Sequence, residues 1–366
     1  MEIKAAVVHG KGEPFKLEKV TLAEPQMGEV LVRIVASGIC RTDIGAQLQE
    51  KNVPLPAILG HEGAGVVEKV GPGVTTFKPG DHVVMSYSYC GTCKNCLKGK
   101  EYACDYAYEV NFGGAMPDGT HRHFIDGQHV SIFFGQSSLA TYSVVSADNL
   151  VKVDPEVPLE LLGPLGCGIQ TGSGTIFNKL KPELGSTLAV FGCGTVGLSA
   201  IMAAKLAGCR MVIGVDIHDS RLELAQQLGA THVINARHTD VVQTIKELTG
   251  GGLDYGVDCS GSPQVLRQAT DSLAVGGTVA LVGGTSTDTE VTLNMNKLLF
   301  DKTVSGVVQG NSIPKLFIPQ LIELYKQGRF PFDKLLTFYD FDQINQAVED
   351  MKSGKVIKPV IRIGSV

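Results

Sequence analysis

The chain has 366 residues, of which 43% are hydrophobic and 19% charged, so it is not disordered and is long enough for two domains. Its net charge of −5 excludes a strongly basic nucleic-acid-binding surface. The N-terminal residues lack the apolar core of a secretory signal, and the longest uncharged apolar run, 188–204, is shorter than the roughly 20 residues of a membrane span. We therefore expect a cytoplasmic protein with reduced cysteines and with neither a nucleic-acid nor a membrane partner.

The first 150 residues predict a β-rich domain. Short apolar segments alternate with turns that contain Gly, Pro or Asp, at 60–63, 71–73 and 78–81. Short strands with closely spaced turns are typical of barrel-like β domains. The predicted strands are 5–8, 29–37, 64–70 and 82–87.

From about residue 170, predicted strands alternate with predicted helices, which is typical of a doubly wound parallel sheet. The tail returns to two helices and a final strand. We therefore expect an α/β protein with a β-rich domain (1–168 and 309–366) and a doubly wound domain (169–308). The predicted strands are 187–192, 211–216, 232–235, 255–260, 278–284 and 356–364, and the predicted helices are 195–208, 220–230, 241–248, 265–273, 314–328 and 344–354.

A glycine-rich motif, GCGTVG at 192–197, follows a predicted strand and opens a predicted helix. In this context the glycines allow a tight turn and a close approach to a pyrophosphate, whose charge lies at the helix N-terminus. Asp216 ends the next predicted strand; its carboxylate would accept the ribose hydroxyls and repel a 2′-phosphate, which favours NAD over NADP. The alternative is an ordinary strand–turn–helix connection. The glycines concerned are Gly192, Gly194 and Gly197.

Four cysteines, Cys90, Cys93, Cys96 and Cys104, lie in one short segment with no strand or helix pattern. Four thiolates at this spacing can surround one tetrahedral zinc ion and leave no position for water, so the predicted site is structural. An iron–sulfur cluster is the alternative, although its usual spacings differ. Disulfides are disfavoured by the expected compartment.

Four further residues are spread along the β-rich region: Cys40, His61, Glu62 and Cys167. Two thiolates and an imidazole would make a three-ligand zinc site with an open fourth position, as catalytic zinc requires. Spacing alone leaves this open, because a cysteine is often a small buried apolar residue and a histidine before a glycine turn is often only a polar loop residue.

Together these motifs resemble the zinc-dependent medium-chain alcohol dehydrogenases along essentially the whole chain. The resemblance implies a GroES-like catalytic domain, a Rossmann coenzyme domain, two zinc ions per chain and NAD. Within the family, segments 133–138, 159–172 and 317–335 look most like the bacterial aryl-alcohol dehydrogenases. The motifs that carry the resemblance are CRTD (40–43), GHEGAG (60–65), the cysteine loop (90–104), GCG (166–168) and GCGTVG (192–197) with Asp216.

The resemblance also implies a role for each residue of the scattered set. Cys40, His61 and Cys167 would bind the catalytic zinc. Asp43 would hydrogen-bond and orient the imidazole of His61. Glu62 would lie behind the metal.

The resemblance further implies residues for the substrate and coenzyme. Thr42 would hydrogen-bond the substrate hydroxyl and begin the path by which its proton leaves. Arg41 and Lys358 fall where the family places cations against the NAD pyrophosphate, and Arg221 falls near the adenosine ribose; solvated surface charges are the simpler interpretation of such cations. One position departs from the family: many relatives carry a proton-relaying histidine where this chain has Gly45, so the relay beyond Thr42 stays open.

The expected reaction is zinc-dependent oxidation of a primary aromatic (benzyl-type) alcohol to an aldehyde, with hydride transfer to NAD. The alternative within the family is an allylic terpene alcohol of the geraniol type. A non-catalytic zinc- and NAD-binding redox sensor is the alternative from another class, and the retained Cys40, His61 and Cys167 disfavour it. We also expect a homo-oligomer, either a dimer or a tetramer, as in the family.

Overall fold

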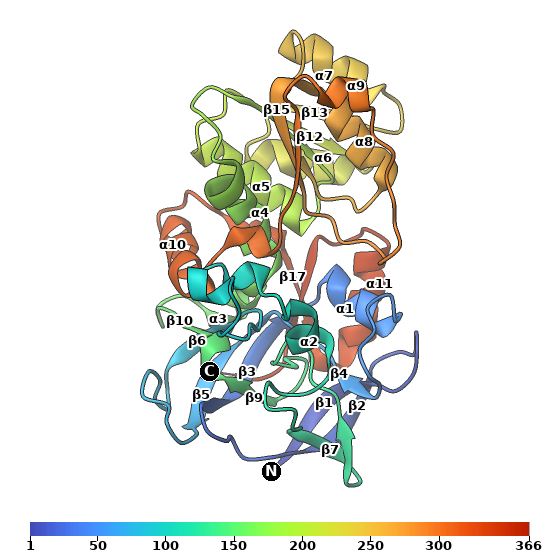
Figure 1. Ribbon diagram of the computed structural model, residues 1–366. Coiled ribbons are helices and arrows are strands. Elements are labelled where there is room, and N and C mark those ends of the chain that lie inside the picture. The colour runs from blue at the N-terminus through green and yellow to red at the C-terminus, as the bar shows by residue number, and fades with distance from the viewer. Residues whose placement is uncertain (366) are drawn as a thin grey trace. The chain divides into compact units, whose positions relative to one another are not determined.

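The computed structural model describes residues 1–365, and its contacts divide the chain into two units (Figure 1). The first unit comprises Met1–Cys167, Ile313–Glu323 and Asp333–Val366, and the second comprises Gly168–Ser312 and Leu324–Phe332. Three segments that were expected in the β-rich domain cluster with the second unit instead: residue 168, residues 309–312 and residues 324–332. The expected boundaries marked changes in sequence pattern, whereas the contacts depend on where the segments pack.

Two mainly antiparallel sheets form the first unit. One has the strand order β4-β1-β2-β7-β8; the other has the order β10-β6-β5-β3-β18-β17, with β9 also pairing with β3. The first sheet contains β1 (Glu2–Val8), β2 (Lys16–Leu22), β4 (Ala57–Ile58), β7 (His123–Ile125) and β8 (Gln128–Val130). The second contains β3 (Glu29–Gly38), β5 (Gly63–Val70), β6 (His82–Met85), β9 (Tyr142–Ser146), β10 (Leu150–Lys152), β17 (Leu336–Asp340) and β18 (Lys358–Arg362).

The C-terminal strand β18 inserts beside β3, and the two strands are antiparallel, with Val360 opposite Gly38. This pairing brings the tail of the chain next to the residues that follow β3. The helices of the first unit are short apart from those near the C-terminus. They are α1 (Arg41–Gln47), α2 (Ala107–Phe112), α3 (Leu159–Leu162) and α11 (Ile344–Lys352); α10 (Pro314–Lys326) begins in this unit.

The second unit contains a six-stranded parallel sheet with the order β13-β12-β11-β14-β15-β16. Numbered within this sheet, the order is 3-2-1-4-5-6, the doubly wound Rossmann arrangement, and ligands of such sheets bind at the carboxyl ends where the order reverses, between β11 and β14. The predicted α/β class is confirmed. The strands are β11 (Thr187–Phe191), β12 (Met211–Asp216), β13 (His232–Asn235), β14 (Leu253–Asp258), β15 (Leu273–Leu281) and β16 (Thr303–Gly306). The helices are α4 (Gly168–Gly174), α5 (Thr195–Leu206), α6 (Asp219–Leu228), α7 (Val241–Thr249), α8 (Pro263–Asp271) and α9 (Met295–Leu298).

The interiors of the sheets account for the apolar segments of the sequence. All five residues of β11 are buried, as expected for a central strand of a parallel sheet that is covered on both faces. Within residues 1–365, none of the helices combines the length and the apolar character needed to cross a bilayer.

One buried histidine makes the stability of the first unit depend on pH. His123 in β7 is fully buried, and in the described part of the chain neither of its ring nitrogens has a hydrogen-bond partner. Burial, with smaller effects of the neighbouring Arg122 and His121, lowers the pKa of His123 to about 4. Because the unfolded chain takes up this proton near pH 6.5 and the folded chain does not, stability is lost as the pH falls from about 6.5 to about 4.

We expect His123→Leu to remove this loss, which amounts to at most about 3 kcal/mol for the full shift in pKa. Urea unfolding at pH 7.5 and pH 5 measures how much of the free energy of unfolding the wild-type chain and the variant each lose between these pH values. The loss of stability between the two pH values should be smaller in the variant, whereas substitution of the exposed His238 should leave it unchanged. Equal losses in wild type and His123→Leu would contradict this interpretation.

Candidate functional site

Three segments of the first unit bring the scattered candidate ligands together. Cys40 lies just before α1, His61 and Glu62 lie just before β5, and Cys167 follows a short 3-10 turn over Gly163–Gly166. The ligand atoms of Cys40, His61, Glu62 and Cys167 all lie within 4.8 Å of one another. The turn before Cys167 requires glycine, because a side chain at Gly166 would collide with the carbonyl oxygen of Met85.

Asp43 holds two of these segments in place. Its Oδ1 accepts hydrogen bonds from His61 Nδ1 at 2.9 Å and Gly60 N at 3.0 Å, and its Oδ2 accepts one from Cys40 N at 2.7 Å. A proton held on Nδ1 leaves the lone pair of His61 on Nε2. This Nε2 is buried and has no hydrogen-bond partner among the described residues. Against the effect of burial, Asp43 and Cys40 raise the pKa of His61 well above its usual value. A zinc ion would displace the proton from Nε2, and this nitrogen and the two adjacent sulfurs would then be the donor set that the ion requires, so the residues fit the metal.

The two thiols of this cluster differ in acidity. A hydrogen bond from Cys167, assisted by Lys358 and His61, lowers the pKa of Cys40 well below its usual value, although burial opposes this. The hydrogen bond with Cys40 and burial raise the pKa of Cys167 well above its usual value. The pair therefore shares one proton, and a divalent cation that binds both sulfurs would displace it.

Glu62 of this cluster forms a buried ion pair with Lys358. The ammonium of Lys358 is 2.9 and 2.8 Å from the two carboxylate oxygens of Glu62 and 2.9 Å from the carbonyl oxygen of Ile39. Burial raises the pKa of Glu62 to about 7, against the lowering effect of Lys358. The three contacts use all three donors of the ammonium, so a contact with the NAD pyrophosphate would require it to give up at least one of them. Lys358 therefore lies beside the candidate zinc ligands and is not a solvated surface charge.

Two neighbours of Cys40 lie on α1. Thr42 Oγ1 is 3.8 Å from Cys40 Sγ, which places the hydroxyl at the edge of the ligand cluster. Arg41 is largely exposed and forms an ion pair with Glu50 at 2.9 Å. A surface ion pair of this kind contributes little to stability and is readily exchanged for another anion.

Aromatic rings cover the imidazole of His61, and no sequence motif indicated this contact. The ring of Phe134 stacks on it with centroids 4.5 Å apart, and Phe133 meets it edge-on at 5.5 Å. Both phenylalanines belong to one buried cluster with Tyr87 and Leu139. Aromatic rings therefore cover part of the imidazole of His61.

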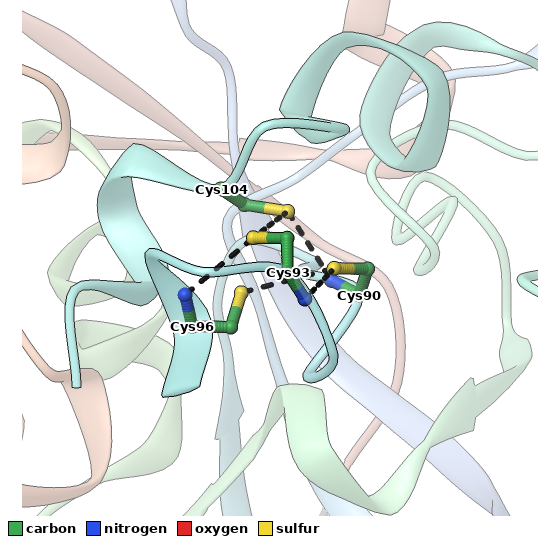
Figure 2. Close-up of side chains that lie close together, drawn as sticks. All are labelled: Cys90, Cys93, Cys96 and Cys104. Atoms are coloured by element: carbon green, nitrogen blue, oxygen red, sulfur yellow. Dashed lines mark hydrogen bonds between the residues drawn. The ribbon is translucent and has the colours of Figure 1, made fainter. Parts of the chain in front are cut away.

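The four-cysteine loop forms a second, separate cluster in the first unit (Figure 2). The sulfur of Cys90 is 3.9 Å from that of Cys96, and the sulfur of Cys93 is 4.0 Å from that of Cys104. A tetrahedron with zinc–sulfur bonds of ~2.3 Å has edges of about 3.8 Å, so the sulfurs already have the spacing that zinc requires.

Backbone donors also prepare this loop for thiolates. The amide of Cys93 donates to Cys90 Sγ at 3.3 Å, and that of Tyr106 donates to Cys104 Sγ at 3.4 Å. Although burial opposes it, donors from Thr92 and Cys93 lower the pKa of Cys90 to about 6. Hydrogen bonds to the charged form therefore favour a thiolate at Cys90. Burial raises the pKa of Cys104, and raises that of Cys96 to about 12, so a metal ion that binds all four sulfurs would displace the protons of these two.

In the second unit, the glycine-rich turn is closed by Asp216. Its Oδ2 accepts a hydrogen bond from Cys193 N at 2.7 Å, and its Oδ1 accepts from Ile217 N at 2.8 Å and His218 N at 3.0 Å. Gly192 has a φ of +97°, and a side chain at Gly197 would collide with the carbonyl oxygen of Gly192. Gly194 is the N-cap of α5.

Arg221 lies close to the same carboxylate, with its guanidinium 3.8 Å from Asp216. The structure thus places Asp216, Arg221 and the glycines at the carboxyl ends of β11 and β12, next to the N-terminus of α5. This is the position where doubly wound sheets bind dinucleotides.

Comparison with known proteins gives a family for both parts of the chain. Residues 26–155 match the alcohol dehydrogenase GroES-like domain, and residues 195–327 match the zinc-binding dehydrogenase domain. Geraniol dehydrogenase of Castellaniella defragrans is 43% identical over 98% of this chain and 97% of its own length. The class-P alcohol dehydrogenase of Arabidopsis thaliana is 36% identical over 99% of this chain and 97% of its own length.

Among solved structures, benzyl alcohol dehydrogenase of Acinetobacter calcoaceticus has a TM-score of 0.97 and 49% identity, with 100% of both chains covered. An alcohol dehydrogenase zinc-binding domain protein of Burkholderia ambifaria has the same TM-score, identity and coverage. These matches confirm the predicted fold and family. The chain belongs to the zinc-dependent medium-chain alcohol dehydrogenases, whose cofactors are zinc and NAD.

Proposed function

We propose that the chain oxidises primary aromatic alcohols of the benzyl type to aldehydes, with hydride transfer to NAD. The observation that carries the substrate class is the packing of Phe133 and Phe134 on the imidazole of His61, which places aromatic rings beside one of the candidate zinc ligands. The 49% identity to a benzyl alcohol dehydrogenase supports the same class. In this proposal the first unit is the catalytic, zinc-binding domain and the second unit binds NAD.

Residues of the first unit have separate roles in metal binding, ligand orientation and proton transfer. Cys40, His61 Nε2 and Cys167 hold the catalytic zinc, and Asp43 keeps the proton on the other nitrogen of His61. When bound, zinc supplies Lewis acidity that lowers the pKa of the substrate hydroxyl, and NAD accepts the hydride. The hydroxyl of Thr42 lies beside Cys40 and accepts a hydrogen bond from the substrate hydroxyl as that proton leaves.

A terpene alcohol such as geraniol is the second candidate substrate, because a geraniol dehydrogenase is 43% identical over nearly the whole chain. An aromatic ring and an isoprenoid chain both bury apolar surface, and small apolar differences discriminate by only about 1–3 kcal/mol. Both substrates also have a carbinol carbon whose partial positive charge is stabilised by conjugation as the hydride departs.

We expect kcat/KM for benzyl alcohol to exceed that for ethanol by about tenfold to several hundredfold, because burying a ring stabilises the bound state by up to a few kcal/mol. NADH formation is measured with benzyl alcohol, cinnamyl alcohol, geraniol, cyclohexylmethanol and ethanol under one set of conditions. Equal values for ethanol and benzyl alcohol would overturn the aromatic class. A higher kcat/KM for geraniol than for benzyl alcohol would favour the terpene class. Equal kcat/KM for cyclohexylmethanol and benzyl alcohol would show that conjugation at the carbinol carbon does not contribute to the preference.

Preference for NAD is expected to depend on the charge of Asp216. We expect Asp216→Gly to weaken NAD binding and to raise the ratio of kcat/KM with NADP to that with NAD by about 10- to 100-fold, because the repulsion of the 2′-phosphate is removed. Since Asp216 also accepts three backbone hydrogen bonds, Asp216→Asn is needed to separate loss of charge from loss of the turn. Asp219→Asn removes an exposed charge three residues on and should leave the ratio unchanged. A wild-type preference for NADP would contradict the assignment.

A further inference from the structure

A buried amide, that of Gln136, touches the segment that carries a candidate zinc ligand. Its Nε2 donates to the carbonyl oxygens of His61 and Ser86, both at 3.0 Å, and its Oε1 accepts from Gly63 N at 3.4 Å. The side chain is fully buried. Both donors and the acceptor of the amide therefore contact main-chain groups: those of His61, of Gly63 two residues on, and of Ser86, the residue after β6.

Ser86 extends this contact to a second ligand segment. Its hydroxyl donates to the carbonyl oxygen of Gly166 at 2.9 Å, and Gly166 is the residue immediately before Cys167. Ser86 is 1% exposed. A continuous path of buried hydrogen bonds thus joins the peptide of His61, through Gln136 and Ser86, to the peptide that precedes Cys167.

The turn that carries Gln136 is built at a conformational cost. Phe134 has a φ of +54° and Ser137 a φ of +49°, a region that side chains other than glycine occupy rarely. Ser137 compensates locally, because its hydroxyl accepts from Phe133 N at 3.0 Å and donates to the carbonyl oxygen of Ile58 at 2.7 Å. Such strain persists only where the surrounding contacts enforce it, and it concentrates at functional sites.

We propose that Gln136 and Ser86 are positioning residues for the zinc site and act as one hydrogen-bonded bridge between the His61 and Cys167 segments. Asp43 ties Cys40 to His61, and the bridge ties His61 to Cys167, so every segment that carries a ligand is fixed to another. The inference rests on the proposed function, because it takes Cys40, His61 and Cys167 as the ligands. Without the bridge, buried carbonyl groups lose their donors and the main chain moves to satisfy them, which misplaces the ligands.

Asn111 provides a matched control. It is a buried amide of the same unit with the same pattern: its Nδ2 donates to the carbonyl oxygens of Ser88 and Ala107, and its Oδ1 accepts from Ser88 N. These three partner groups belong to Ser88 and Ala107, neither of which is a candidate ligand of the catalytic zinc or adjacent in sequence to one. Loss of this amide costs stability in the same way as loss of Gln136, but it leaves the bridge intact.

The experiment compares Gln136→Met, Ser86→Ala, the double variant and Asn111→Leu as zinc- and NAD-loaded enzymes. Three quantities are measured: the rate at which a chromogenic chelator removes each zinc, the visible absorption band after cobalt replaces the zinc, and kcat with the KM for NAD. Cys40→Ser identifies the chelation phase that belongs to the catalytic zinc, because that phase should be missing from it.

We expect Gln136→Met and Ser86→Ala to speed release of the catalytic zinc by about 10- to 100-fold, to shift the cobalt band and to lower kcat with an unchanged KM for NAD. Each single variant is expected to increase the rate of zinc release by some factor. Because both residues belong to one bridge, the factor for the double variant should be smaller than the product of the two single factors. Asn111→Leu should lower the thermal stability. Its rate of release of the catalytic zinc and its cobalt absorption band should both equal those of the wild type.

The inference is overturned if Gln136→Met and Ser86→Ala behave as Asn111→Leu does, with lower stability but unchanged zinc release and cobalt spectrum. If Gln136→Met does not fold, the smaller change Ser86→Ala decides the question alone. Retention of two zinc ions by Cys40→Ser would instead contradict the proposed ligand set, so the two failures can be told apart.

Discussion

Cys40→Ser is expected to lower kcat by more than about 1000-fold while the chain stays folded, binds NAD and keeps one zinc ion out of two. A serine hydroxyl is neutral at pH 7 and is a poor ligand for zinc compared with a thiolate, so the site at His61 and Cys167 loses its metal. A 1000-fold loss corresponds to about 4 kcal/mol of transition-state stabilisation, which is the scale of losing a Lewis acid. Turnover, zinc content and NAD binding measure the three expectations.

Cys209→Ser is the matched control for this variant. Cys209 is a half-buried free cysteine of the second unit and lies in neither of the two metal-binding clusters. The control should keep two zinc ions and wild-type turnover. If Cys40→Ser also keeps both, Cys40 is not a ligand of the metal that supports catalysis.

The second large effect is expected at the four-cysteine loop. Cys104→Ser should lower the free energy of unfolding by roughly 3 kcal/mol or more, and the melting temperature by roughly 10 °C, because a closed thiolate site contributes its metal-binding energy to folding. The sulfur of Cys104 lies 4.0 Å from that of Cys93 and accepts the amides of Cys90 and Tyr106, so its loss removes several contacts within the loop.

Calorimetry and limited proteolysis test this expectation. Cleavage within residues 90–104 should become faster in Cys104→Ser, and the zinc content should fall to one. Cys40→Ser serves as the control, since it also loses one zinc ion but should keep the wild-type melting temperature and resistance to cleavage. A wild-type melting temperature for Cys104→Ser would show that the loop does not stabilise the fold.

How far the sequence predicts each metal cluster depends on the distance between its ligands along the chain. The cysteines from Cys90 to Cys104 are close enough for their spacing alone to predict a zinc site, and the sulfur distances fit that prediction. Cys40, His61 and Cys167 meet only because β3, β5 and the turn before α4 pack together. No local pattern encodes that packing, and only the resemblance to a family indicated it.

The sheets show the same contrast. Alternation of strands and helices predicts the parallel sheet of the second unit, because each crossover is a local feature of the chain. The pairing of β18 with β3 joins segments more than 300 residues apart, so the tail is predicted only as a strand. That pairing places Lys358 beside Glu62. Lys358 is therefore buried in an ion pair, whereas the sequence alone offered no reason to distinguish it from an exposed cation.

Gln136 shows what sequence patterns miss entirely. Glutamine is a common polar residue, and its three contacts with His61, Ser86 and Gly63 exist only in the folded chain. In the sequence, Phe133 and Phe134 stood out only as part of segment 133–138, which resembles aryl-alcohol dehydrogenases; nothing indicated that they contact His61. Phe134, which stacks on the imidazole, has a left-handed backbone that the sequence did not indicate.

The most direct test of the catalytic zinc at Cys40, His61 and Cys167 is the activity of the wild-type enzyme as a function of its zinc content during stepwise chelation. We predict two zinc ions per chain at the start and a loss of turnover in proportion to the zinc removed in the chelation phase that Cys40→Ser lacks. The melting temperature should stay nearly constant in that interval, and added zinc should restore activity. Turnover that persists after this phase is complete, or that falls only together with the melting temperature in the other phase, would contradict the account.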